Sequence, residues 1–188
     1  MAISFVDMFN RTFVRYCAVF ISTFLVLYYG TTAFIGITAE GGKYYNAWLA
    51  HNLNYVAWLR GGILYGACGM MRLLGFDASI VGQFSIHIQH SATVQMVYSC
   101  LGYGVISFWL AFIVANTASI KTKLIWGLCG LAVIVFSNML RVCILLVAID
   151  KKWPTFFEID HHTFYNICSY IIVIALIWAF NRRINKQL

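Results

Sequence analysis

The chain has 188 residues, of which 62% are hydrophobic and 10% are charged, and it contains one proline. This balance excludes a soluble globular protein, because too few polar side chains are available to cover a water-exposed surface. The net charge of +7 does not indicate a nucleic-acid-binding protein, since most of the basic residues flank hydrophobic runs, where they anchor and orient membrane helices. We therefore expect an integral membrane protein that binds no nucleic acid.

Four hydrophobic runs are long enough to cross a bilayer as helices. They are residues 16–37, 97–116, 124–149 and 163–180. No linker, repeat or low-complexity tract divides them, so we predict one integral membrane domain over residues 1–188. The stretch before Tyr16 has no apolar core, and we expect the first run to remain as a helix instead of being cleaved as a signal peptide.

Basic residues beside these runs indicate how the helices are oriented. The positive-inside rule places seven of them on the cytoplasmic side: Arg11, Arg15, Lys121, Lys123, Arg182, Arg183 and Lys186. Lys43, Lys151 and Lys152 are left on the outer side. The first run then exits to the outside and the second enters from the outside.

The segment 43–75 must therefore cross an even number of times or not at all. Its stretch AWLAHNLNYVAWLRGG carries His51, Asn52, Asn54 and Arg60, while apolar residues recur in it at helical spacing. We favour an amphipathic helix that lies in, or dips into, the outer leaflet. Two short crossings are the alternative, so the fold class is an all-α polytopic membrane protein with four to six transmembrane helices.

The next stretch, QFSIHIQHSATVQMV, has a different periodicity. Phe84, Ile86 and Ile88 alternate with polar residues, and Val94 and Met96 resume the period of two. This pattern predicts a small extracytoplasmic β-hairpin that turns near Ser91 and leads directly to Cys100. His87 and His90 do not indicate a metal site, because residues three apart in a strand point to opposite faces and no further ligands complete a tetrahedral set.

Three residues with possible chemistry fall near the outer membrane surface, on three different predicted helices. Cys100 lies at the outer end of the second helix, and His162 lies at the outer start of the last. Arg141 lies eight residues before Ile149, a depth of about 12 Å at 1.5 Å per residue. A cation near the bilayer centre costs roughly 2.5–3.5 kcal/mol even on a lenient scale, so such residues usually mark function.

Each of these residues also has a simpler interpretation. Arg141 could extend its side chain to the membrane surface, and histidine is common at interfaces. A cysteine in an apolar helix is usually a small hydrophobic packing residue. We expect this of five of the six cysteines: Cys17, Cys68, Cys129, Cys143 and Cys168.

Together, Cys100, Arg141 and His162 have the properties that peptide cleavage requires. A cysteine attacks as the thiolate, which a nearby cation or imidazole favours. An arginine remains charged under all ordinary conditions, and a histidine exchanges protons near neutral pH. Spacing in the sequence does not establish that the three residues meet.

These motifs resemble those of the exosortase and archaeosortase family, which consists of membrane cysteine transpeptidases. The resemblance covers about residues 55–180 and rests on Cys100 in VYSCLGYG, on Asn138 and Arg141 in SNMLRV, and on the histidine pair in DHHTFYN. It is strengthened by the amphipathic segment and β-like region before the cysteine. Longer relatives carry additional helices upstream, so the resemblance implies a short, single-domain member.

The resemblance implies that Cys100 is the nucleophile, Arg141 the essential arginine and His162 the third catalytic residue, with Asn138 and His161 in support. Many members have Ser or Ala where this chain has Leu101, and glycine where it has Asn166. That glycine follows the catalytic histidine by four residues, which favours His162, and His161 stays open as the alternative. No cofactor or metal is implied.

The expected substrates are membrane-anchored proteins whose C-terminal tail comprises a short motif, a membrane helix and a basic cluster. The enzyme would cleave this sorting signal on the outer face of the cytoplasmic membrane and pass the acyl group to an acceptor. Gly102, Gly104, Gly127 and Gly130 are candidate positions for close approach of the substrate helix. Two alternatives are a non-catalytic membrane assembly subunit and a small anion transporter that uses Arg141. The recognition motif, the acceptor and the oligomeric state do not follow from the sequence.

Overall fold

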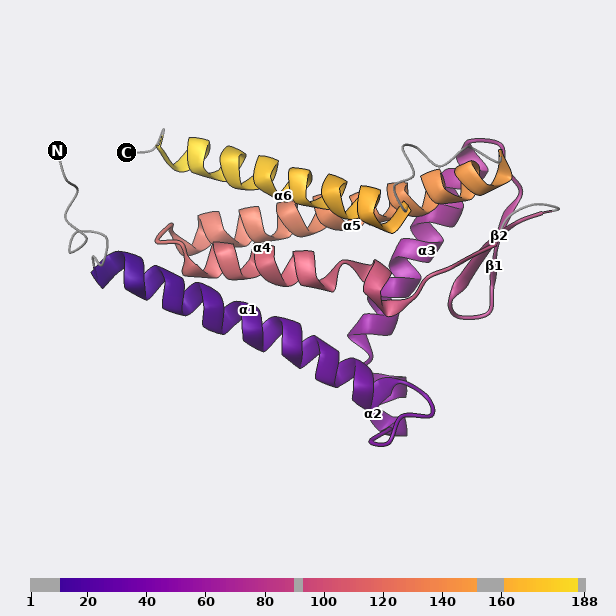
Figure 1. The fold of residues 1–188 in the computed structure, drawn as a ribbon, viewed down its shortest axis with the longest axis horizontal. Helices are drawn as coiled ribbons and strands as arrows, with labels where there is room; N and C mark the ends of the chain where they lie inside the picture. The colour runs from indigo at the N-terminus through magenta and orange to yellow at the C-terminus, as the bar shows by residue number, and fades with distance from the viewer. Residues whose placement is uncertain (1–10, 90–92, 152–160, 186–188) are drawn as a thin grey trace.

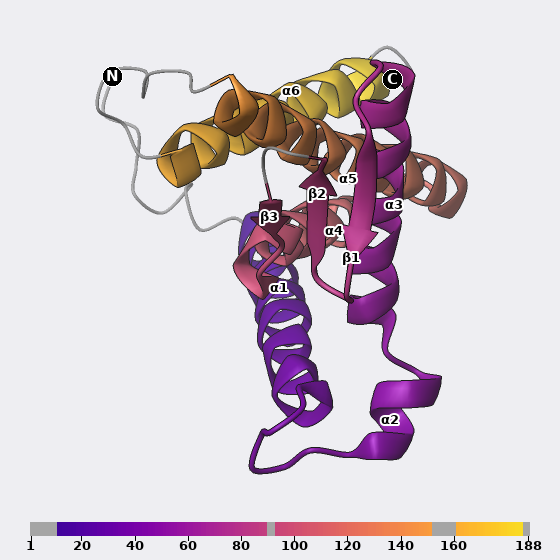
Figure 2. The ribbon, with the colours of Figure 1, turned by 90° about the vertical axis from the view of Figure 1, so that its right-hand side faces the viewer.

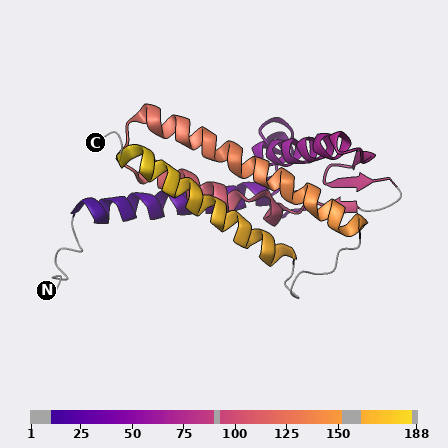
Figure 3. The same ribbon diagram turned by 90° about the horizontal axis from the view of Figure 1, so that it is seen from above.

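The computed structural model describes residues 11–89, 93–151 and 161–185, without the side chains of residues 161–164 and 185. Its long helices are α1 (Arg11–Thr38), α4 (Tyr103–Ala115), α5 (Ile120–Asp150) and α6 (His161–Asn185). They lie roughly along one direction, both from the side (Figure 1) and from above (Figure 3). Within the described residues, four helical segments have the length and composition to cross a membrane: α1, α5, α6, and α4 together with the 3-10 turn before it. The prediction of a polytopic helical membrane protein is confirmed.

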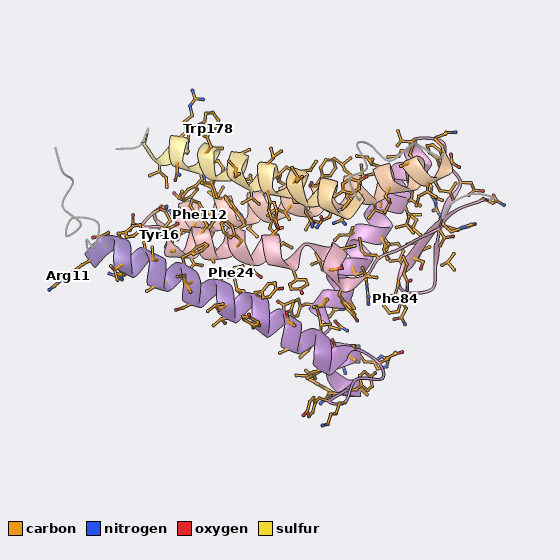
Figure 4. The ribbon with its side chains drawn as sticks, in the orientation of Figure 1. Arg11, Tyr16, Phe24, Phe84, Phe112 and Trp178 are labelled. Atoms are coloured by element: carbon orange, nitrogen blue, oxygen red, sulfur yellow. The ribbon has the colours of Figure 1, made fainter. Side chains whose placement is uncertain are left out.

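The two ends of the helix bundle differ in composition. Arg11 at the start of α1, Lys121 at the start of α5 and Arg182 near the end of α6 lie at one end, which we term the basic end. Figure 4 shows Arg11 there. A small β-sheet lies at the opposite end, which we term the sheet end. Because successive long helices alternate in direction, the cysteine before α4 lies in the sheet-end half of the bundle.

Aromatic side chains join α1 to α4. Tyr16, Phe20, Phe24 and Tyr28 are spaced four residues apart along α1, and neighbouring rings are separated by 6.4, 6.4 and 5.7 Å. Figure 4 shows Tyr16 and Phe24 on the side of α1 that faces α4. Phe108 of α4 meets Phe20 edge to face at 5.2 Å, and Tyr103 stacks on Tyr28 at 5.3 Å. Such pairs stabilise contacts beyond the area that they bury.

A second cluster fixes α4, α5 and α6 toward the basic end. Trp109 and Phe180 are fully buried there, and Phe112 and Ile134 are nearly so. The indole of Trp109 lies against Gly130, where any Cβ would collide with it, and Gly127 lies against Ile113 of α4. Gly127 and Gly130 therefore admit α4 and not a substrate helix, so this part of the sequence-based docking hypothesis was wrong.

The segment after α1 forms two helices instead of one amphipathic helix. They are α2 (Ala47–Asn52) and α3 (Tyr55–Leu73). Asn46 and Asn54 cap them, accepting hydrogen bonds from the backbone N–H groups of Leu49 and Ala57. Figure 2 shows α3 running across the end of the bundle, and it is not among the segments apolar enough to span a membrane. None of the segments apolar enough to span a membrane lies within residues 43–75, so the alternative of two short crossings there finds no support.

Three short antiparallel strands form the sheet, in the order β1 (Ala78–Val81), β2 (Ser85–Ile88) and β3 (Thr93–Gln95). The hairpin expected from the period of two is β2 and β3, with Ile86 opposite Val94. The expected turn at Ser91 lies outside the described residues. β1 was not predicted, because four residues without clear alternation give a weak signal.

One face of the sheet and one face of α3 pack on the sheet-end half of α5 (Figure 2). Ile63 and Met71 of α3, Ile86 of β2 and Leu146 of α5 are fully buried in this core. Leu101, directly after Cys100, is fully buried in the same cluster. The sheet and α3 thus hold the turn that carries the cysteine.

Candidate active site

Cys100 lies on a 3-10 turn, η2 (Tyr98–Leu101), and not on the long helix that the sequence predicts to begin at residue 97. Gly102 separates this turn from α4 with φ of +70°, a backbone conformation that residues with a Cβ rarely adopt. The turn is half-buried at Cys100, and the backbone N–H of Cys100 donates to the carbonyl of Val97 at 2.9 Å. The helix break therefore places the thiol just before the N-terminus of α4, where the helix dipole favours negative charge.

Asn138 fixes the other side of this turn. Its buried Nδ2 donates a hydrogen bond of 3.0 Å to the carbonyl of Leu101. The same atom lies 2.6 Å from where a Cβ at Gly102 would be. Asn138 therefore supports the site by binding the backbone of the cysteine turn.

Arg141 lies one helical turn beyond Asn138 and meets the thiol directly. Its Nη2 is 3.7 Å from the Sγ of Cys100, although the two residues are 41 positions apart in the sequence. The guanidinium also lies over the ring of Tyr165 in α6, 5.2 Å from its centroid. The structure therefore brings Cys100 and Arg141 together, on the inner side of α5.

The two histidines begin α6, but their side chains lie outside the described part of the structure. Their positions in the helix can still be compared. His162 precedes Tyr165 by three residues and Asn166 by four, and His161 precedes Tyr165 by four and Asn166 by five. Residues three or four apart share a helix face. Both histidines thus share a face with Tyr165, but only His162 also shares one with Asn166.

An elongated groove opens beside this pair, with a volume of about 710 Å³. Arg141, Asn138, Ser99 and Gly102 line one part of it, and the remaining wall comes from α1, α4 and α6. Cys100 does not itself line the groove, but Arg141, which does, contacts its thiol.

Arg60 of α3 is a candidate site residue that the sequence did not single out. Its guanidinium lies 3.8 Å from the ring centroid of Phe84 and 4.7 Å from that of Tyr98, which begins the cysteine turn. Only 6% of its surface is exposed. Burial lowers the pKa of the guanidinium, an effect that the adjacent Tyr98 opposes. The available sequence signal was a single arginine within an otherwise apolar segment. It was not sufficient, because the aromatic partners of Arg60 lie 24 and 38 residues further along the chain.

Two of the other five cysteines are packing residues in the core. Cys68 and Cys143 are buried, and their thiols donate to the carbonyls of Ala78 and Ala67 at 3.3 and 3.5 Å. The ring of His87 shares a 2.8 Å hydrogen bond with Thr93 across the strands. His90 lies outside the described residues.

Comparison with known protein families places this geometry in context. Residues 9–179 match the family described as transmembrane exosortase. The chain belongs to the transmembrane exosortase family. The match includes α1 and so extends well upstream of the resemblance expected over residues 55–180. No curated protein and no solved structure matches the chain. Within this exosortase, Arg141 contacts the thiol of Cys100 and so places a cation beside a potential nucleophile.

Proposed function

We propose that this exosortase is a membrane-embedded cysteine transpeptidase. It cleaves the C-terminal motif, helix and basic tail of exported, membrane-anchored proteins on the outer face of the cytoplasmic membrane, and transfers the product to an acceptor. The observation that carries the proposal is the 3.7 Å contact between Arg141 and Cys100, which pairs a nucleophile with a permanent cation at membrane depth.

The proposed reaction has two steps. The Cys100 thiolate attacks the scissile carbonyl carbon, and Arg141 stabilises the negative charge that develops on sulfur and then on oxygen. The carbon–nitrogen bond breaks, and His162 gives the departing amine the proton that it took from the thiol. An amine or water then attacks the thioester, its proton passes to His162, and the sulfur leaves as thiolate.

The charge distribution supports an outward-facing site. Arg11, Lys121 and Arg182 lie at the basic end, whereas Cys100 and Arg141 lie in the sheet-end half. The positive-inside rule assigns the basic end to the cytoplasm. The scissile peptide would then meet the thiol after export, near the outer membrane surface.

Cys100 gives the direct test. The five other cysteines are replaced by alanine, and this variant is expressed with a protein that carries a tripartite tail. We expect processing together with an acyl adduct on Cys100 that hydroxylamine releases, as detected by mass spectrometry. The matched control, Cys100→Ala with the other five cysteines retained, should accumulate full-length substrate and form no adduct.

The same experiment separates the alternatives. A non-catalytic assembly subunit or an anion transporter requires Arg141 but no acyl-enzyme. Full processing by Cys100→Ala, or an adduct on another cysteine, would contradict the transpeptidase proposal.

A further inference from the structure

The groove beside Arg141 lies between α1 and α6, with α4 as its floor. Along α6 it extends from Asn166 to Ile177. These eleven steps at 1.5 Å per residue give about 16 Å, or roughly half the 30 Å hydrocarbon thickness of a bilayer. The groove therefore has the length of half a transmembrane helix.

The groove changes in polarity along its length. Phe24 and Leu25 of α1, Phe108 of α4, and Val173 and Ile177 of α6 line its apolar part. Its other end is polar, with Ser99, Asn138, Arg141, Asn166 and Ser169. This polar end is continuous with the reactive pair, because Arg141 contacts Cys100.

Asn166 indicates what kind of molecule fits. Its side chain is exposed and, among the residues that the structure describes, makes no hydrogen bond. An amide at membrane depth without a partner is costly, so an occupant that offers donors or acceptors is favoured. A lipid acyl chain could fill the apolar part but would leave this amide unpaired. A peptide whose helix unwinds at the polar end supplies free backbone N–H and C=O groups.

We propose that the groove between α1 and α6 is the docking surface for the apolar membrane helix of the protein substrate. The outer half of that helix packs on α1, α4 and α6, and the non-helical residues before it lie against Asn166 and Arg141 within reach of Cys100. This inference rests on the proposed function and adds the place and orientation in which the tail binds.

Two isoleucines of α6 provide a matched pair of variants. Ile174 lines the groove and is 65% exposed, whereas Ile171 is 60% exposed and does not line it. Ile174→Trp fills the groove and should lower the processing of a tailed substrate about tenfold or more, while Ile171→Trp should change it less than about twofold. Both variants should keep the wild-type rate of Cys100 alkylation by a small thiol reagent, which shows that the site is folded.

Cross-linking identifies the occupant. A photoreactive phenylalanine analogue is placed at position 174 or 171 in a Cys100→Ala background, which holds uncleaved substrate. We expect capture of the substrate's membrane helix from position 174 and not from position 171. Equal capture from both positions, or capture of lipid alone from position 174, would overturn the groove proposal.

The two proposals fail in different ways. If the wild-type chain processes the tail through a Cys100 adduct but Ile174→Trp and Ile171→Trp behave alike, the docking surface is wrong and the transpeptidase stands. If the wild-type chain neither processes the tail nor forms the adduct, the proposed function fails and the docking surface fails with it.

Discussion

Arg141 is held at membrane depth by partners inside the bundle. Its guanidinium contacts the thiol of Cys100 and the ring of Tyr165, and Asn138 one turn earlier binds the backbone of the cysteine turn. A cation in a membrane needs such partners, because lipid supplies none.

Arg141→Lys tests this role. A single ammonium cannot reproduce the planar fork of donors that reaches both sulfur and oxyanion, so we expect processing to fall about 100-fold or more. The variant should remain folded, as judged by thermal unfolding in detergent. Arg72→Lys is the control, since the Nε of Arg72 donates a hydrogen bond of 2.8 Å to the backbone carbonyl of Ala78 and Arg72 does not line the groove. Near-wild-type processing by Arg141→Lys would remove the cation from the mechanism.

The histidine pair gives a second prediction. Because His162 shares a helix face with both Tyr165 and Asn166, we expect His162→Ala to abolish processing and His161→Ala only to reduce it. The measurement is the single-turnover rate of substrate cleavage for each variant. The reverse ranking would assign the proton carrier to His161. Equal, mild effects would exclude both histidines from proton transfer.

At the scale of elements, the break between η2 and α4 sets the position of the nucleophile. A continuous helix from residue 97 would place Cys100 within a membrane helix. The left-handed conformation of Gly102 instead ends the turn before α4 begins, and Asn138 binds the carbonyl of Leu101 in that turn. α3 and the sheet then hold the turn from the opposite side through Arg60, Phe84 and Tyr98.

Gly102→Ala should therefore be destabilising. The left-handed conformation costs an L-residue about 1–2 kcal/mol, and the new Cβ would lie 2.6 Å from the Nδ2 of Asn138. Gly36→Ala on α1 is the matched control, because a Cβ there meets open space and its helical backbone accepts alanine. Thermal unfolding of the two variants in the same detergent measures the difference. Equal stability of both would show that the turn tolerates another backbone conformation.

Arg60 links α3 to the cysteine turn, and a double-mutant cycle measures that link. Arg60→Met keeps a flexible, unbranched side chain but removes the charge that stacks on two rings, a contact worth about 2 kcal/mol when it is desolvated. We expect slower processing and altered alkylation kinetics of Cys100, with partial rescue in Arg60→Lys. Combining Arg60→Met with Phe84→Leu should cost less than the sum of the single changes. Strict additivity would show that the stacking is not coupled.

At the scale of the whole molecule, the distribution of basic residues predicts how the chain is oriented in the membrane. The basic end holds the helix termini with Arg and Lys, and the sheet end holds α3 and the strands (Figure 1). We expect the sheet end to face outward.

Cysteine accessibility checks this orientation in intact cells. In a variant without native cysteines, Gln95→Cys on β3 should react with a membrane-impermeant maleimide added outside, because Gln95 is exposed at the sheet end. Lys121→Cys at the start of α5 should react only after the membrane is opened. The opposite pattern would reverse the topology and place Cys100 toward the cytoplasm.

The sequence by itself determined the membrane class, the four spanning segments, the hairpin and the family motifs. Each of these is a property of a contiguous stretch: hydrophobic length sets a span, a period of two sets a strand, and a motif is read from neighbouring residues. The span expected over residues 97–116 is confirmed. The break within it was not predicted, because it depends on the left-handed backbone of one residue, Gly102.

Only the tertiary structure decided which side chains meet. The contact between Arg141 and Cys100, the bond from Asn138 to Leu101 and the stacking of Arg60 on Phe84 each join segments that are far apart in the sequence. Such contacts depend on the rotation of each helix about its axis and on the packing between helices. Hydrophobic runs that are apolar on all sides do not encode that rotation. The groove between α1 and α6 likewise exists because both helices pack on α4 and leave a space between them, which no local pattern specifies.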